Sequence, residues 1–446
     1  MNREYLIQEK PMKAILILAI PMIIGNLFQQ FYTMADSIIV GRFIGEKALA
    51  AVGASYALTN VFISIAIGGG IGASVITSHY FGERRYQEMK KSISTALISF
   101  LVLSIILSIF GLSRSTELMV LLNTPENILE MATRYLDIYF YGLPFLFMYN
   151  VLAAMFNALG RSRIPLYLLI FSSILNVVLD LYFVISLNMG VSGAAWATFI
   201  AQGISAILAF LIFIRELSSY PSKLQGFFST GELKRTTRMA LPSILQQSTV
   251  SIGMLLVQSV VNSFGAEILA GFSAASRVES ICIVPMAALG NAMSTYTAQN
   301  LGARRYQRVH EGYLSGAKLV GLFALAFCII LALFHTPIIS LFLGEDSTEL
   351  AMQTGTGFLK FIGWFFIFIG LKMSTDGVLR GAGDTKVFTL ANLVNLSIRV
   401  SVSALLAPLF GVAMVWYAIP MGWLANFLIS FWEYRKYRWK YVPVTT

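Results

Sequence analysis

The chain has 446 residues, of which 57% are hydrophobic and only 12% are charged. Soluble domains usually contain about 25% charged residues, so this composition indicates an integral membrane protein and argues against a soluble enzyme. The formal charge of +10 could indicate nucleic-acid binding, but most Lys and Arg residues lie in short loops on one side of the predicted spans. We therefore expect no nucleic-acid partner.

Long runs without charged residues predict the membrane helices in chain order, since about 20 apolar residues span a bilayer. The runs cover 14–35, 48–82, 92–113, 138–160, 164–179, 181–214, 239–266, 280–303, 319–344, 361–371, 387–398 and 400–432. Some runs contain a turn and some helices continue past an internal charge, and together they predict twelve membrane helices. No connection between them is long enough to hold a soluble catalytic domain.

The longest connection, 215–238, divides the chain near its middle and contains Pro221, Gly226 and Gly231. Prolines and glycines in a polar stretch are typical of a loop. We expect a cytoplasmic linker here, between an N-terminal six-helix bundle, 1–214, and a C-terminal six-helix bundle, 239–446.

The basic residues predict the orientation of the spans. When the N-terminus is placed in the cytoplasm, most of the 32 Lys and Arg residues fall in cytoplasmic loops and at the two termini. The outer loops then receive only Arg42, Lys47, Arg114 and Arg134. We therefore expect a multi-pass protein of the cell (inner or plasma) membrane with both termini in the cytoplasm.

The two halves of the chain resemble each other. Short segments of the first half recur about 220 residues later in the second: 19–21 (AIP) as 240–242 (ALP), 82–86 (GERRY) as 302–306 (GARRY), 159–163 (LGRSR) as 382–386 (AGDTK), and 190–191 (GV) as 411–412 (GV). Six helices per repeat is an even number, so both halves enter the membrane from the same side. Parallel repeats of this kind predict a substrate site between them.

Two acids lie deepest in apolar sequence, Asp36 in the first predicted helix and Asp180 in the fifth. An ionisable side chain inside a span costs roughly 2.5–3.5 kcal/mol, so it is a functional-site hypothesis. Asn176 precedes Asp180 by one helical turn on the same face, and Thr198 of the sixth helix is a candidate neighbour. Two carboxylates that approach in low dielectric repel, which favours a bound proton or a sodium ion. The alternative is that both acids are hydrated at the membrane interface.

Other polar residues in the spans are candidates for a cavity that contacts substrate. They are Asn150 in the fourth predicted helix, Gln246 and Gln247 in the seventh, and Arg277 in the eighth. Ordinary hydrogen bonding between helices explains Asn150 and Thr198 equally well. For Arg277, ion pairing between helices is the preferred interpretation.

No metal-ligand cluster, nucleophile–base pair or phosphate-binding loop appears in the sequence. The glycine-rich run 68–72 follows no strand and has no lysine at the spacing of a P-loop, so it predicts close packing of helices. The repeated GxRRY motifs predict helix ends that are anchored at the inner side. We expect no enzyme activity and no cofactor.

The most specific motifs lie in both halves of the chain. They are Ile20-Pro21, Asp36 with Val40-Gly41-Arg42, Leu49-Ala50-Ala51, Gly160-Arg161-Ser162, Asn176-Val177-Val178-Leu179-Asp180, Gly190-Val191 with Gly193-Ala194-Ala195, and Leu379-Arg380-Gly381-Ala382-Gly383-Asp384-Thr385. Together, over roughly 13–434, the chain resembles the multidrug and toxic compound extrusion (MATE) family of cation-coupled efflux transporters, particularly its prokaryotic branches.

The resemblance implies an all-α membrane protein with twelve transmembrane helices, in two six-helix bundles arranged as a V around a central cleft. It implies that Asp36, Asn176, Asp180 and Thr198 bind the coupling ion, and that the first helix bends at Pro21. Family members with a second cation site carry acids in the seventh and tenth helices. Here the seventh helix offers Gln246 and Gln247, and the tenth offers Lys372, which argues against a sodium site in the second bundle.

We therefore expect a secondary multidrug exporter that antiports amphipathic or cationic organic compounds against protons or sodium ions. We expect it to act as a monomer in the lipid bilayer and to contribute to antibiotic resistance. The first alternative is a lipid-linked oligosaccharide flippase of the same wider superfamily, whose anionic cargo would favour the basic residues of the second half. A membrane enzyme or channel is a further alternative, which the parallel repeat does not favour.

Overall fold

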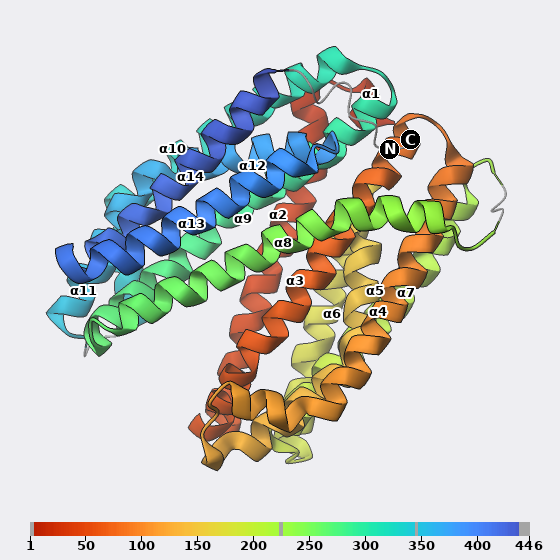
Figure 1. Cartoon of the computed structure of the whole chain (residues 1–446). Helices are drawn as coiled ribbons and strands as arrows, with labels where there is room; N and C mark the ends of the chain where they lie inside the picture. Colours follow the sequence, from red (N-terminus) through yellow and green to blue (C-terminus); the bar gives the residue numbers. More distant parts are fainter. Residues whose placement is uncertain (1–3, 223–225, 344–346, 437–446) are drawn as a thin grey trace. The chain divides into compact units, whose positions relative to one another are not determined.

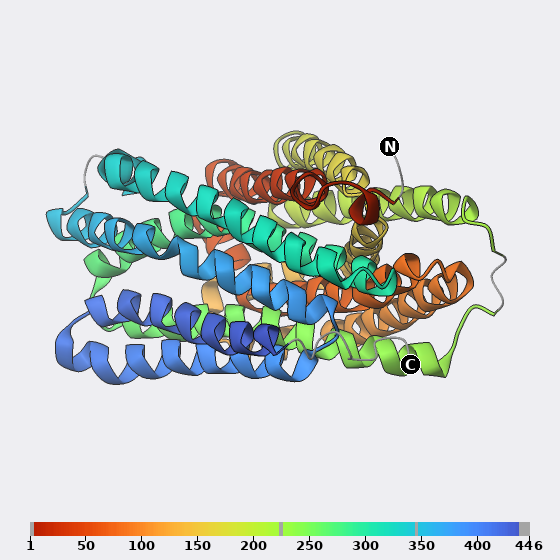
Figure 2. The same ribbon diagram turned by 90° about the horizontal axis from the view of Figure 1, so that it is seen from above.

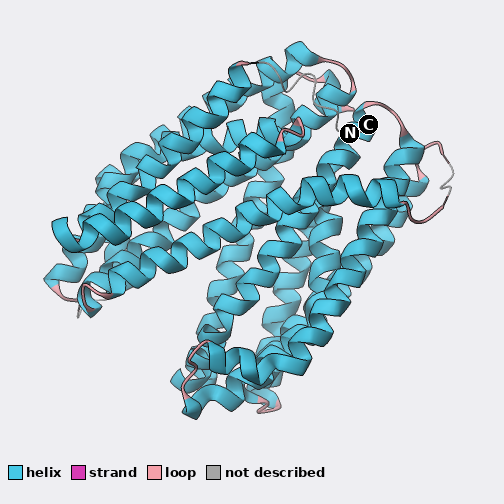
Figure 3. Ribbon diagram, in the orientation of Figure 1, coloured by secondary structure: helices cyan, strands magenta, loops and turns pink. Residues whose placement is uncertain are grey.

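The computed structural model describes residues 4–222, 226–343 and 347–436. Every regular element in these ranges is a helix (Figure 3). In chain order they are α1 (Tyr5–Gln8), α2 (Pro11–Ile39), η1 (Val40–Ile44), α3 (Glu46–Gly82), α4 (Tyr86–Leu121), α5 (Glu126–Ala158), α6 (Arg163–Leu181), η2 (Tyr182–Ser186), α7 (Gly190–Ser218), α8 (Thr230–Asn262), α9 (Ala266–Gly302), α10 (Tyr306–Leu343), α11 (Glu349–Ile362), η3 (Gly363–Phe365), α12 (Phe366–Gly381), α13 (Thr385–Phe410) and α14 (Ala413–Arg435).

Twelve spans long and apolar enough to cross a membrane occur within the described ranges, which confirms the predicted number. In the tenth span, α11 and α12 are joined end to end by the short 3₁₀ turn η3. Many large apolar side chains on these helices are exposed, for example Ile105 and Ile109 of α4. Apolar side chains can face outward in this way because the solvent of a membrane helix is lipid.

The chain forms two compact units, which we call the first unit (Ile24–Ile244) and the second unit (Met1–Ile23 with Leu245–Thr446). In the first unit, α5 packs against α3, α4 and α7. Phe156 of α5 meets Phe213 of α7 edge to face, with the ring centroids 4.9 Å apart. Edge-to-face contacts of this kind suit the aromatic quadrupole and fix the two helices against each other.

In the second unit, α9 is the central helix and packs against α10, α11 and α12. The helices α13 and α14 lie side by side, as both views in Figures 1 and 2 show, and α14 also packs on α12. The core of this unit includes the buried rings of Tyr296, Phe358 and Phe366.

The borders of the two units cut through α2 and α8 rather than through the connections between helices. They fall at Ile23–Ile24 and Ile244–Leu245, just after Pro21 and Pro242. This division differs from the expected boundaries at 214 and 239, because the start of α2 packs in the second unit and the start of α8 packs in the first. Apolar periodicity identifies a helix but does not show which bundle receives each of its ends.

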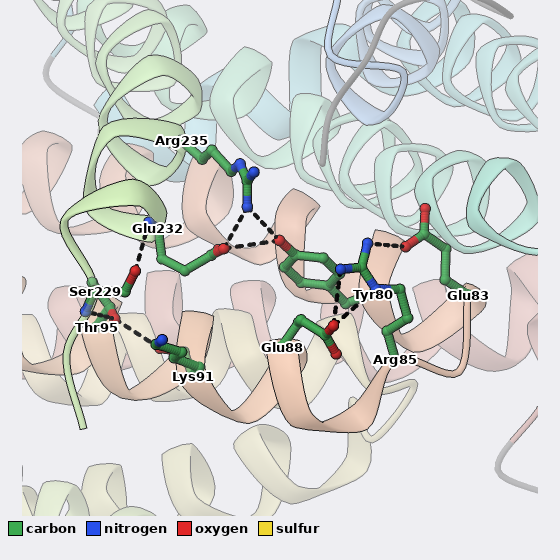
Figure 4. Close-up of polar contacts among 9 residues, drawn as sticks. All are labelled: Tyr80, Glu83, Arg85, Glu88, Lys91, Thr95, Ser229, Glu232 and Arg235. Atoms are coloured by element: carbon green, nitrogen blue, oxygen red, sulfur yellow. Dashed lines mark hydrogen bonds and ion pairs between the residues drawn. The ribbon is translucent and has the colours of Figure 1, made fainter. Parts of the chain in front are cut away.

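The start of α8 packs closely against α3 within the first unit. A Cβ added to Gly68 would lie 2.6 Å from Cα of Ile244, so the backbones touch as the glycine run predicted. Farther toward the start of α8, Glu232 Oε1 accepts hydrogen bonds from Tyr80 Oη (2.9 Å) and Arg235 Nη1 (2.6 Å) (Figure 4). Arg235 Nη1 also donates to Tyr80 Oη at 2.9 Å. This polar triad anchors α8 beside the glycine contact.

The start of α2 and the short helix α1 are held in the second unit by the other copy of the GxRRY motif. Arg305 Nη1 donates to the carbonyl of Ile7 at 2.9 Å, and Arg308 Nη2 donates to the carbonyl of Glu9 at 2.6 Å. Carbonyls at a helix end lack intrahelical partners and favour cations. Both motifs end a helix, with positive φ angles of 58° at Arg84 and 56° at Arg304. The prediction that these motifs end helices is therefore confirmed, and their place at the inner side of the membrane stays a prediction.

Candidate cation-coupling site

Three helices of the first unit bring the four predicted ion-binding residues together. Asp36 lies on α2, Asn176 and Asp180 lie on α6, and Thr198 lies on α7. Asn176 and Asp180 are almost completely buried, and Asp36 is partly buried. Asn176 reaches Thr198 of α7, which packs on α6, and the one-turn spacing places Asp180 next to Asn176 on the same face.

The amide of Asn176 links Thr198 to Asp180. In the orientation that satisfies both ends of the amide, Nδ2 of Asn176 donates to Asp180 Oδ2 at 2.8 Å. Its Oδ1 accepts from Thr198 Oγ1 and from the backbone N–H of Thr198, each at 3.1 Å. This choice of orientation follows from the hydrogen-bond pattern, as is usual for amide groups. Asn176 therefore positions one oxygen of Asp180.

The carboxyl groups of Asp36 and Asp180 lie within hydrogen-bonding reach of each other. One oxygen of each, Oδ1, is buried and has no hydrogen-bond partner within the described ranges. Buried polar atoms are nearly always partnered, so an orphan on a functional side chain calls for an explanation. A proton shared by the two carboxyl groups, or a small cation between them, would supply the missing interaction.

Two tyrosines, Tyr32 and Tyr135, lie close to this carboxyl pair and were not identified from the sequence. Tyr32 hydrogen-bonds Thr198 and is electrostatically close to both acids, as is Tyr135 of α5. Tyr139, one turn beyond Tyr135, donates from Oη to the carbonyl of Thr59 at 3.1 Å. The available signal was the spacing, because Tyr32 stands one turn before Asp36 on the same face of α2. Among 19 tyrosines, that spacing was not distinctive.

Both acid-bearing helices end in a π-helical turn close to the acid. The turn η1 (Val40–Ile44) follows α2, and η2 (Tyr182–Ser186) follows α6. The two turns contact each other. Single π turns are rare and are frequent at functional sites. The two π-helical turns therefore lie next to the carboxyl pair, and they independently indicate a functional site there.

The other predicted residues have surroundings of their own. Asn150 donates from Nδ2 to the carbonyl of Leu146 at 2.8 Å, one turn back along its own helix. In the second unit, Gln246 Oε1 accepts from Arg380 Nη1 at 3.2 Å, Gln247 is half-buried, and Arg277 is exposed. A substrate role for these four residues stays a prediction. Pro21 lies inside α2, next to the border of the two units.

The chain matches the model of the MatE family over residues 21–182 and 242–405. It is 30% identical over 440 residues to the probable multidrug resistance protein YpnP of Bacillus subtilis, covering 98% of each chain. Its fold is similar to that of a MOP-superfamily transporter from Pyrococcus furiosus with a binding pocket of reverse polarity (TM-score 0.92, 25% identity, 99% of each chain). It is also similar to a multidrug resistance MATE transporter in an outward-facing conformation (TM-score 0.89, 25% identity, 98% of each chain). The chain therefore belongs to the MatE family, the multidrug and toxic compound extrusion transporters that its motifs resemble.

Proposed function

We propose that this protein is a secondary multidrug exporter, which moves amphipathic or cationic organic compounds out of the cell in exchange for protons or sodium ions. The observation that carries the proposal is the buried carboxyl pair Asp36–Asp180, in which one oxygen of each group has no hydrogen-bond partner within the described ranges. The similarity to the multidrug resistance protein of Bacillus subtilis supports drugs as cargo.

The coupling ion would bind at the carboxyl groups of Asp36 and Asp180. A proton or a sodium ion at Asp36 and Asp180 removes the repulsion between two carboxylates in a medium of low dielectric. Asn176 and Thr198 hold Asp180 in place for this exchange. Release of the ion restores the repulsion, so the two states of the site differ in the preferred distance between α2 and α6.

Helix α2 offers a route from the ion site to the rest of the molecule. Its outer part carries Asp36 in the first unit, and its start is buried in the second unit through Ala14, Ile15 and Leu18. Pro21 removes one backbone hydrogen bond between these parts and favours a bend there. A change of charge at Asp36 would therefore be felt as a change in the bend of α2.

The proposal is tested by export from membrane vesicles of one orientation under imposed proton or sodium gradients. Asp36→Asn and Asp180→Asn remove the charge with little change of shape and should lower gradient-driven export at least about tenfold, since each removes an ion-binding group. Glu130→Gln, in the exposed ion pair with Arg134, is the matched control and should export normally. If both aspartate variants export at the wild-type rate, the coupling role of the pair is wrong.

The proposal also covers the orientation of the protein, its oligomeric state and its cofactors. The termini lie in the cytoplasm, the protein acts as a monomer in the bilayer, and it needs no cofactor besides the coupling ion. The lipid-linked oligosaccharide flippase is not favoured by the multidrug relatives. Ion flux at channel rates without cargo would instead indicate a channel.

A further inference from the structure

The second unit also contains a buried carboxylate, but its surroundings differ from those of Asp36 and Asp180. Helix α12 carries Lys372 and Asp376, which are 3% and 1% exposed. Their spacing of one helical turn puts both side chains on the same face. Lys372 Nζ lies 3.4 Å from Asp376 Oδ2, so a fixed ammonium group accompanies this carboxylate.

Each oxygen of Asp376 has a partner. Asn392 Nδ2, from α13, donates to Oδ2 at 3.2 Å, and Ser430 Oγ, from α14, donates to Oδ1 at 2.7 Å. The ammonium group donates in turn to Asn392 Oδ1 at 3.0 Å. Buried ion pairs are stable only when such additional hydrogen bonds satisfy the remaining atoms. This cluster meets that condition.

The atoms around the ammonium group of Lys372 are the kind that a small free cation would use. Carboxylate and amide oxygens from Asp376 and Asn392 face one positive charge in a site closed to solvent. Hard oxygen atoms of this type are also the preferred ligands of sodium-like ions. A lysine ammonium is a compact point charge on a flexible stem and can take the place of such an ion.

We propose that Lys372 is a tethered counter-cation: its ammonium group occupies the position beside Asp376 that a free monovalent cation would otherwise take. The second unit then neither binds nor releases a coupling ion, and ion exchange is confined to the first unit. The inference rests on the proposed cation-coupled function. It assigns to Lys372 a role in the number of ions moved per transport cycle.

The contrast between the two units carries the argument. In the first unit, Asp36 and Asp180 face each other, and one oxygen of each has no hydrogen-bond partner within the described ranges. In the second, the carboxylate of Asp376 has a permanent positive partner and both of its oxygens are bound. A bound ion would give the unpartnered oxygens of Asp36 and Asp180 an interaction that they lack. Asp376 already has the ammonium group of Lys372 in that place.

The test uses Lys372→Met, which keeps most of the length of the side chain and removes the charge. The probe is sodium chloride, replaced at constant ionic strength by choline chloride, and the readout is the Tm of the purified full-length protein at pH 8. We expect sodium to raise the Tm of Lys372→Met by at least about 2 °C more than that of the wild type, because a ligand that binds only the folded state stabilises it. The double variant Lys372→Met/Asp376→Asn should lose this extra rise, and Lys318→Met, on the exposed side of α10, should behave as the wild type.

Two outcomes would overturn the inference. The first is a Lys372→Met protein whose sodium response equals that of the double variant, which would show that the cluster does not accept a free cation. The second is a folded double variant whose export has lost its dependence on the ion gradient, which would place coupling in the second unit. The double variant also covers the case in which Lys372→Met fails to fold, since removing both charges of a buried pair is often well tolerated. Lys372→Met and the double variant differ only at residue 376. The difference between their Tm responses to sodium therefore does not depend on whether Asp36 and Asp180 couple transport.

Discussion

Tyr80 near the end of α3 and Glu232 near the start of α8 are hydrogen-bonded at 2.9 Å, although 152 positions separate them in the chain. Arg235 binds both side chains, so the three groups form a closed triad (Figure 4). The contact attaches the first turn of the second sequence half to the first unit. It is therefore one of the contacts that place the start of α8 in the first unit, although the rest of α8 belongs to the second.

Tyr80→Phe tests how strongly this triad holds α8. The variant removes a hydroxyl that donates to Glu232 and accepts from Arg235, and it leaves the ring in place. Loss of a buried hydrogen-bonding partner should lower the free energy of unfolding by about 1–3 kcal/mol. Thermal unfolding of the purified protein measures the change, and Tyr141→Phe, at an exposed tyrosine of α5, should leave the Tm within error of the wild type.

Gly72→Ala tests the close approach of α3 and α8. A Cβ at this position would overlap the backbone of Ala240, which cannot move without displacing the start of α8. We expect the substitution to lower stability by about 1–3 kcal/mol, as overpacking of a core does. Gly53→Ala, on the same helix but with no atom within 4 Å of the added carbon, should be neutral or slightly stabilising because alanine favours a helix. Equal changes of stability in the two variants would contradict this assignment, because only Gly72 faces the backbone of α8.

The sequence was sufficient to predict the twelve helices, because charge-free runs of the length of a bilayer leave few alternatives. It also brought Asp36, Asn176, Asp180 and Thr198 into one hypothesis, since buried acids are costly and one-turn spacings share a face. These signals are local or energetic, and they can be read from residue types alone.

Contacts between distant segments could not be predicted in the same way. Tyr32 and Tyr135 are apolar enough to belong to any membrane helix, so their approach to the acids became visible only in the structure. The assignment of the ends of α2 and α8 to opposite units depends on packing through Ala14 and Gly68, small residues that carry no distinctive pattern. The hydrogen bonds from Asn392 and Ser430 to Asp376 could not be predicted either, because the three residues lie on three different helices.

The loop after α3 should contribute a small pH dependence to stability. His79 Nδ1 lies 3.5 Å from Glu83 Oε1, and the approach of His79, together with Arg85, holds the pKa of Glu83 below its ordinary value. A depressed carboxyl pKa adds stability at pH values above the unfolded pKa, and this stability is lost as the pH falls through the folded pKa. Glu83→Gln should therefore lose less stability than the wild type as the pH falls below about 4.3, the pKa of an unfolded glutamate. Parallel Tm–pH curves for the two proteins would contradict this assignment.

Thr198→Val tests whether the amide bridge to Asp180 matters for ion binding. The change keeps the shape of the side chain but removes the hydroxyl that hydrogen-bonds Asn176 and Tyr32. Without it, Asn176 Oδ1 keeps only the backbone N–H of residue 198 as a donor and holds Asp180 less firmly. We expect the affinity for the coupling ion to fall by roughly tenfold, the equivalent of one buried hydrogen bond of about 1.4 kcal/mol. The measurement is the half-saturating proton or sodium concentration for export from vesicles. Thr198→Ser retains the hydroxyl and should restore it to near the wild-type value, whereas equal values for the valine and serine variants would show that the methyl group of Thr198, and not its hydrogen bond, supports the site.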